Sequence, residues 1–115
     1  MRSYLIAALL LFIFPQVGIS GEAVGTSTQL VLLDPNNTGL DPRLLFSVSG
    51  PHVNRPACAT VPSRFAIDLT TKSGQEFASV VKMAHATGMQ INVIGRGTCT
   101  IWGDTESVAT LFISP

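Results

Sequence analysis

Two short stretches in the second half of the chain alternate large apolar residues with charged or small ones. They span residues 64–69 and 90–94. Their alternating apolar residues are Phe65, Ile67, Leu69, Ile91 and Val93. A period of two places these side chains on one face of an extended strand, so each stretch is predicted to be a strand with one buried face.

The segment between these two strands, residues 73–87, has the spacing of an amphipathic helix. Its apolar stripe consists of Phe77, Val80, Val81, Ala84 and Thr87. Ser73 followed by Glu76 fits a capping box, which predicts that Ser73 starts the helix. Gly88 follows the last helical position, where a left-handed residue usually ends a helix.

Three further apolar runs, at residues 29–33, 44–48 and 108–113, are also predicted to be strands. Residues 98–102 fit two structures equally, the second arm of a hairpin or an ordered loop held by a disulfide. Residues 21–27 are small and polar, and we expect them to be loose.

This order of elements predicts an α+β domain with a mostly antiparallel sheet and one helix. Its most specific form is a five-stranded, OB-like barrel with the helix between the third and fourth strands.

The N-terminus has the features of a signal peptide at residues 1–20. One arginine precedes an apolar run from Tyr4 to Phe14, which is too short to span a membrane comfortably, and small residues follow. Cleavage is predicted before Gly21, with a cut before Val24 or an uncleaved anchor as alternatives. Residues 21–115 then form one small exported domain, periplasmic or secreted, with no second apolar segment of membrane-spanning length.

Charge argues against nucleic acid as a partner. The whole chain has seven basic and seven acidic residues, and without residues 1–20 six basic residues face seven acidic ones, a net charge of −1. No basic patch or acidic run stands out.

The two cysteines, Cys58 and Cys99, are predicted to form a disulfide, because exported proteins with two cysteines usually pair them. Zinc would need more ligands than these cysteines and the only histidines, His52 and His85, supply at suitable spacing. We therefore predict no metal and no cofactor.

Several segments resemble small exported bacterial proteins of unassigned function. These segments are Pro56–Cys58, Arg64–Asp68, Ala86–Gly88, Gly97–Cys99 and Trp102–Glu106. The layout is also distantly similar to the binding subunits of pertussis-like and subtilase-type toxins, through the helix-to-strand segment Thr87–Val93. That resemblance implies a barrel, a pentameric ring and glycan binding. The chain departs from the toxin pattern in having a single disulfide, no tyrosine-rich strands and no Ser/Thr-rich sugar pockets.

The candidate binding residues are Arg96, Trp102, Asp104 and Glu106. An exposed tryptophan beside two carboxylates suits stacking on a sugar ring with hydrogen bonds to its hydroxyls. The alternative is that Trp102 covers the core while the acidic residues cap a turn. Arg96, between two glycines, suits contact with an anion or is a solvated turn residue.

These observations predict an exported, non-enzymatic domain that binds a glycan or a protein through residues 96–106. The alternative is a structural subunit that assembles into a homo-oligomer. A small hydrolase has the least support, because Asp104 and Glu106 alone do not make a glycosidase pair or a calcium site.

Overall fold

The computed structural model describes residues 20–33 and 41–113, which form five strands and one helix. In chain order these are β1 (Glu22–Leu33), β2 (Arg43–Val48), β3 (Arg64–Asp68), α2 (Lys72–Thr87), β4 (Gln90–Gly95) and β5 (Glu106–Ile113). Apart from Ser20, the predicted signal peptide lies outside the described residues. No helix in the described ranges is both long and apolar enough to cross a membrane.

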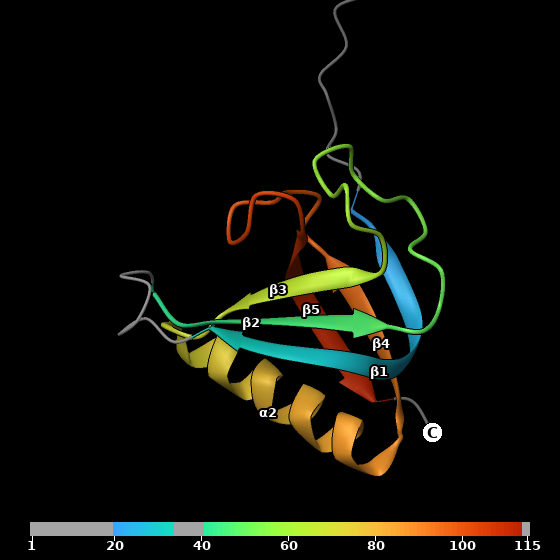
Figure 1. The fold of residues 1–115 in the computed structure, drawn as a ribbon, viewed down its shortest axis with the longest axis vertical. Coiled ribbons are helices and arrows are strands. Elements are labelled where there is room, and N and C mark those ends of the chain that lie inside the picture. The colour runs from blue at the N-terminus through green and yellow to red at the C-terminus, as the bar shows by residue number, and fades with distance from the viewer. Residues whose placement is uncertain (1–19, 34–40, 114–115) are drawn as a thin grey trace, which may run out of the picture.

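The strands close into a barrel in the order β1-β2-β3-β5-β4, with β4 pairing back to β1 (Figure 1). Every pairing is antiparallel except the short one between β3 and β5. Strand β1 closes the ring because its first half, to Thr26, pairs with β4 and its second half, from Ser27, pairs with β2. The prediction of an α+β barrel with one helix between the third and fourth strands is confirmed.

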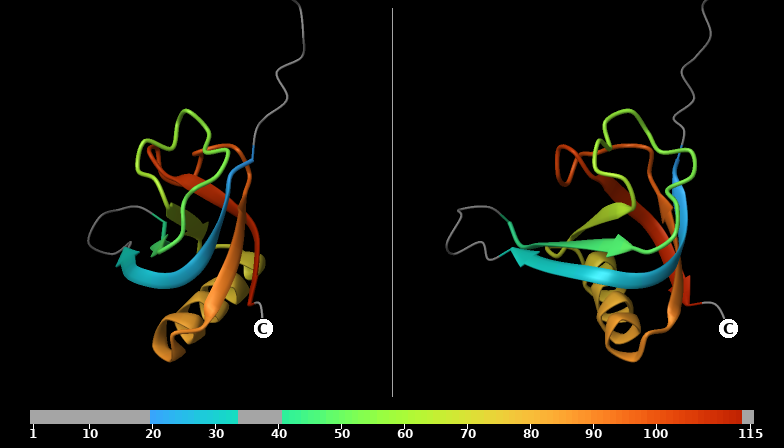
Figure 2. Two further views of the ribbon diagram at one scale, coloured as in Figure 1. Left: turned by 90° about the vertical axis from the view of Figure 1, so that its right-hand side faces the viewer. Right: turned by 45° about the vertical axis from the view of Figure 1, so that its right-hand side comes forward.

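The core forms where the inward faces of the strands meet the helix. Its largest fully buried members are Phe46, Phe65, Leu44, Ile67 and Ile91. Helix α2 lies across one end of the barrel, and the segments 49–63 and 96–105 gather at the other end (Figures 1 and 2). The barrel therefore has a helical end and a loop end, and the loop end contains the candidate residues.

The helix begins earlier than its sequence pattern predicts. Thr71, not Ser73, is the N-cap, and its hydroxyl accepts a hydrogen bond from the amide of Gly74 at 2.9 Å. Gly74 packs against the end of β3, where a Cβ atom would lie 1.8 Å from the Asp68 carbonyl oxygen, so the helix starts immediately after the strand. Gly88 ends the helix with a φ of 72°, as predicted.

The buried face of α2 also ends earlier along the helix than predicted. Ala78, Val81 and Ala84 are buried, whereas Thr87 is exposed and its hydroxyl donates to the Met83 carbonyl. Phe77 and Val80 are partly buried against the core. The stripe prediction was therefore correct for most positions and wrong for Thr87.

The prediction that residues 21–27 are loose was wrong. Residues 22–26 pair with β4, and both Gly21 and Ala23 are buried. Small residues are needed here because the backbones approach closely: a Cβ on Gly25 would lie 2.7 Å from the backbone nitrogen of Gly50. Residues 98–102 form a loop rather than a hairpin arm, which decides between the two predicted alternatives.

Candidate functional site

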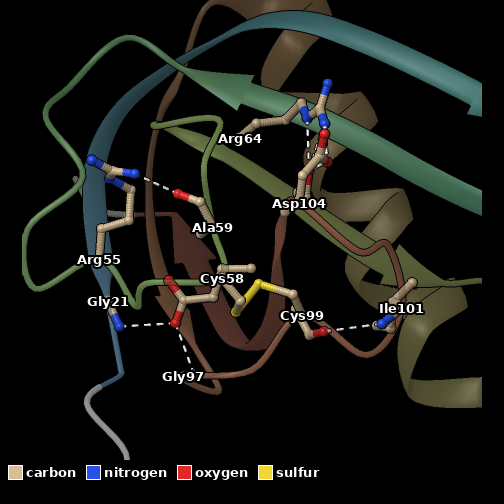
Figure 3. The surroundings of a disulfide bond; sticks show 12 residues. Gly21, Arg55, Cys58, Ala59, Arg64, Gly97, Cys99, Ile101 and Asp104 are labelled. Carbon is tan, nitrogen blue, oxygen red and sulfur yellow. Dashed lines mark hydrogen bonds and ion pairs between the residues drawn. A yellow bond between two sulfur atoms is a disulfide. The ribbon is translucent and has the colours of Figure 1, made fainter.

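A disulfide joins the two long segments at the loop end of the barrel. Cys58 in the segment 49–63 is bonded to Cys99 in the segment 96–105, with their Cα atoms 6.0 Å apart (Figure 3). The predicted pairing is confirmed. The bond fixes the loop containing Arg96, Trp102 and Asp104 to the neighbouring connection, so these candidate residues are presented by a constrained loop.

Glu106 does not join Trp102 and Asp104 on the surface, because its side chain is completely buried. The backbone nitrogens of Gly21 and Gly97 each donate to Glu106 Oε2 at 2.8 Å, and Figure 3 shows both bonds meeting at one carboxylate. The other oxygen, Oε1, lies 2.7 Å from His52 Nε2. Glu106 is therefore a structural acceptor that connects three separate segments, and it is not exposed to a ligand.

The second hydrogen bond of His52 indicates which ring nitrogen accepts. The amide of Ser63 donates to His52 Nδ1 at 3.0 Å, which requires an unprotonated Nδ1. The ring hydrogen then lies on Nε2, where it is donated to Glu106. Only 1% of the His52 side chain is exposed, and its ring packs on Phe65 with their centroids 4.6 Å apart. The geometry thus describes a neutral histidine beside a buried carboxylate.

Glycines make room for the Glu106 side chain. A Cβ atom on Gly95 would lie 2.1 Å from the carboxyl carbon of Glu106, and one on Gly21 would lie 2.4 Å from its Oε1. Both distances are far below van der Waals contact. A larger residue at either position would therefore have to displace the buried Glu106 side chain.

Asp104 has a structural partner of its own. Its Oδ1 accepts from Arg64 Nη2 at 2.6 Å, and the same guanidinium donates to the Thr105 hydroxyl through Nε and Nη2. The Asp104 side chain is 47% exposed, so this pair contributes little to stability, about 0–1 kcal/mol. Its effect is to fasten the end of the loop to the start of β3.

Trp102 and Arg96 occupy different surroundings. Trp102 is half-buried, and its carbonyl accepts from the amide of Thr105 in a tight turn. Arg96 is exposed, and its Nε donates to the Val108 carbonyl at 3.1 Å. The structure therefore separates the four candidate residues: Glu106 faces the interior, Asp104 faces Arg64, and Arg96 lies at the opposite end of the loop.

Arg96 borders a pocket of about 290 Å³ between the loop, the end of β3 and the start of α2. Its lining mixes polar and apolar residues: Ile67, Asp68, Thr71, Ser73, Gly74, Phe77, Arg96, Thr100, Ile101 and Val108. Trp102, Asp104 and Glu106 are not among them. The pocket volume lies just below the range of roughly 300–1,000 Å³ typical of ligand sites, which favours a small ligand.

Asp68 is the acidic residue among those that line this pocket. Hydrogen bonds from the hydroxyl and the amide of Thr70 lower the pKa of Asp68, which burial partly offsets, and the nearby charge of Arg43 lowers it further. The side chain is therefore ionised at neutral pH. The residues around the pocket thus include one acidic residue, Asp68, one basic residue, Arg96, and the hydroxyl-bearing residues Thr71, Ser73 and Thr100.

Neither carboxylate of the sequence-predicted pair is arranged for metal binding. Within residues 20–33 and 41–113, no group of three or more His, Cys, Asp and Glu side chains could hold a metal ion.

Two groups of residues were not predicted from the sequence: the partners of Glu106 and the lining of the pocket beside Arg96. The partners of Glu106 lie 54 and 85 residues away in the sequence, at His52 and Gly21, and no spacing rule connects them. The pocket combines residues from three separate segments. The one signal for the pocket in the sequence was Arg96, a basic residue between two glycines.

Comparisons of the chain with protein-family models, with curated proteins and with solved structures found no match. The pocket and the surface around it are therefore the features of the molecule that bear on its function.

Proposed function

We propose that this protein is an exported, non-enzymatic binding domain and that the pocket beside Arg96 recognises one sugar unit of a glycan. The pocket itself supports this proposal most strongly. Its size suits a single small polar ring, and its lining includes the acidic residue Asp68, the basic residue Arg96 and the hydroxyl-bearing residues Ser73 and Thr100. Sugar hydroxyls need this mixture of partners.

The apolar part of the lining supports the same ligand class. Phe77 and Ile101 border the pocket together with the polar groups. Sugars have C–H faces that pack on apolar and aromatic surfaces, while their hydroxyls bond to polar groups at the rim. An OB-like barrel is a suitable scaffold, since barrels of that type bind oligosaccharides beside the loop between the fourth and fifth strands. In this chain that loop is the segment 96–105.

A glycan array probed with the disulfide-bonded protein tests the proposal, with Arg96→Ala as the pocket variant. We expect the wild-type protein to bind a defined set of glycans and Arg96→Ala to lose about tenfold or more in affinity, since a charged hydrogen bond contributes roughly 1.5–3 kcal/mol. Lys82→Ala is the matched control, because it removes the same charge from an exposed position on α2 outside the pocket. No glycan binding, or equal losses in the two variants, would argue against the pocket.

Assembly into a homo-oligomer is the alternative function, and one surface feature favours it. Val24, Asn92 and Phe112 lie opposite one another on β1, β4 and β5, and this row faces outward. Phe112 is 50% exposed. Because the barrel is closed, assembly would use such a face rather than a free strand edge.

Light scattering under oxidising conditions tests this alternative. If the row is an interface, the wild-type protein forms a discrete multi-subunit species, and Phe112→Asp converts it to monomers by placing a charge in the contact. Thr110→Asp on the same strand, at another exposed position, is the control for added charge. A wild-type monomer at all concentrations would rule out assembly by this chain alone.

A further inference from the structure

At the start of the domain, an exposed residue is followed directly by a buried one. Ser20 is exposed, whereas Gly21 is buried and its nitrogen donates to Glu106 Oε2 at 2.8 Å. The carbonyl of Gly21 then accepts from the amide of Gly95, which attaches this residue to the end of β4. The Gly21 nitrogen is therefore fixed at the edge of the barrel, with the preceding residue in solvent.

The Glu106 carboxylate, which accepts the hydrogen bond from the Gly21 nitrogen, has no positively charged partner among the described side chains. His52 is neutral in the observed hydrogen-bond arrangement, and Gly97 offers only a backbone amide. In the described part of the chain, the ion pair between an arginine and an acid is that of Arg64 with Asp104. A buried carboxylate is costly unless a charge or several donors compensate it. Glu106 thus accepts hydrogen bonds from His52, the Gly97 amide and the Gly21 nitrogen. Of these three donors, the Gly21 nitrogen is the one that would gain a positive charge if it became the N-terminus.

We infer that the mature protein begins at Gly21 and that its new α-ammonium group forms an ion pair with the buried carboxylate of Glu106. The covalent step is hydrolysis by a signal peptidase. Water adds across the Ser20–Gly21 amide, the C–N bond breaks, the hydroxyl stays on the Ser20 carbonyl carbon and a hydrogen passes to the Gly21 nitrogen. The amine then takes a further proton from solvent, since α-amino groups titrate near pH 7.7–8.0.

The structure also distinguishes this cleavage site from the alternative before Val24. A cut before Val24 would remove the donor to Glu106, the buried Ala23 and the pair of backbone hydrogen bonds between Glu22 and Val53. A cut before Gly21 removes none of these contacts. Gly18 and Ser20 supply the small residues that a signal peptidase needs. The barrel is therefore complete only if the chain keeps Gly21.

The first test is the intact mass of the protein recovered from the exported fraction of bacteria that express the full chain with its own leader. We expect the mass of a chain from Gly21 to Pro115 with its disulfide formed. A chain that starts at Val24, or one that retains the leader, would overturn the inference.

The second test asks whether the charge at Gly21 is coupled to Glu106. Two forms of the protein are compared, one starting at Gly21 with a free amine and one starting at Ser20, in which the Gly21 nitrogen is an amide. Each form is made with Glu106 and with the isosteric Glu106→Gln. We expect the free-amine form to melt about 5 °C or more above the extended form, and Glu106→Gln to remove that difference.

Equal melting temperatures for the two wild-type forms, or a difference that Glu106→Gln leaves unchanged, would overturn the ion pair. The wild-type comparison needs no substitution, so it still decides the question if Glu106→Gln fails to fold. Because neither form alters the pocket beside Arg96, a negative result here leaves the proposed glycan binding intact.

Discussion

Replacing Glu106 by leucine is expected to cost roughly 3–5 kcal/mol of folding free energy. Leucine has a similar volume but cannot accept a hydrogen bond, so His52 Nε2, the Gly21 nitrogen and the Gly97 amide all lose their partner. Each buried donor left unsatisfied costs about 1–3 kcal/mol. Small domains have only about 5–15 kcal/mol of net stability, so this substitution removes a large share of it.

Equilibrium unfolding in urea measures this loss, with Glu76→Leu as the matched control. Glu76 is exposed on α2, and the same chemical change there should alter stability by no more than about 0.5 kcal/mol. If the two variants lose equal stability, Glu106 is not the structural acceptor that its contacts describe.

Removing the disulfide is expected to cost about 4 kcal/mol. The bond joins residues 41 positions apart, and the entropy of closing a loop of this length in the unfolded chain corresponds to roughly that value. The double variant Cys58→Ala with Cys99→Ala should therefore unfold at a much lower urea concentration than the wild-type protein. Glycan binding should weaken as well, because Cys99 lies between the pocket residues Arg96 and Thr100.

Treating the wild-type protein with reductant should reproduce the loss seen in the double variant, and the same reductant should leave the double variant unchanged. An unfolding midpoint that stays constant on reduction of the wild-type protein would contradict the stabilising role of the bond.

Strands β3 and β4 were predictable from sequence because large apolar residues alternate along them, although in β3 the intervening Ala66 is buried as well. At β3 and β4 the alternation of large apolar residues with polar or small ones directly reports which side chains enter the core, as for Phe65 and Ile91. The helix was predictable for the same reason, and Gly88 marked its end. Its start was harder to place, because Thr71 and Ser73 are both able to cap and only the close approach of Gly74 to β3 distinguishes them.

The first half of β1 was missed because its pattern is made of small residues. Gly21, Ala23 and Gly25 are buried, but they lack the bulk that makes an alternating pattern visible. Their small size reflects close packing of backbones and of the Glu106 side chain, which are contacts between distant segments. A single sequence carries no record of such contacts.

Glu106 was misplaced for a related reason. Asp104 and Glu106 are two residues apart, and the sequence suggested a shared exposed surface. The loop ends between them, however, and β5 begins at Glu106, so the second carboxylate turns inward to His52. A buried acid cannot be recognised from its neighbours in sequence when its partners are contributed by other segments.

The most direct measurement of the proposed function is the location of the ligand on the barrel. Amide chemical shifts of the ¹⁵N-labelled protein would be followed by NMR as the strongest-binding glycan of the array is added as a free sugar. We expect the largest changes at Thr71–Gly74 and Arg96–Ile101 around the pocket, and none at the outward row of Val24, Asn92 and Phe112. Changes centred on that row, with the pocket amides unmoved, would contradict the proposal.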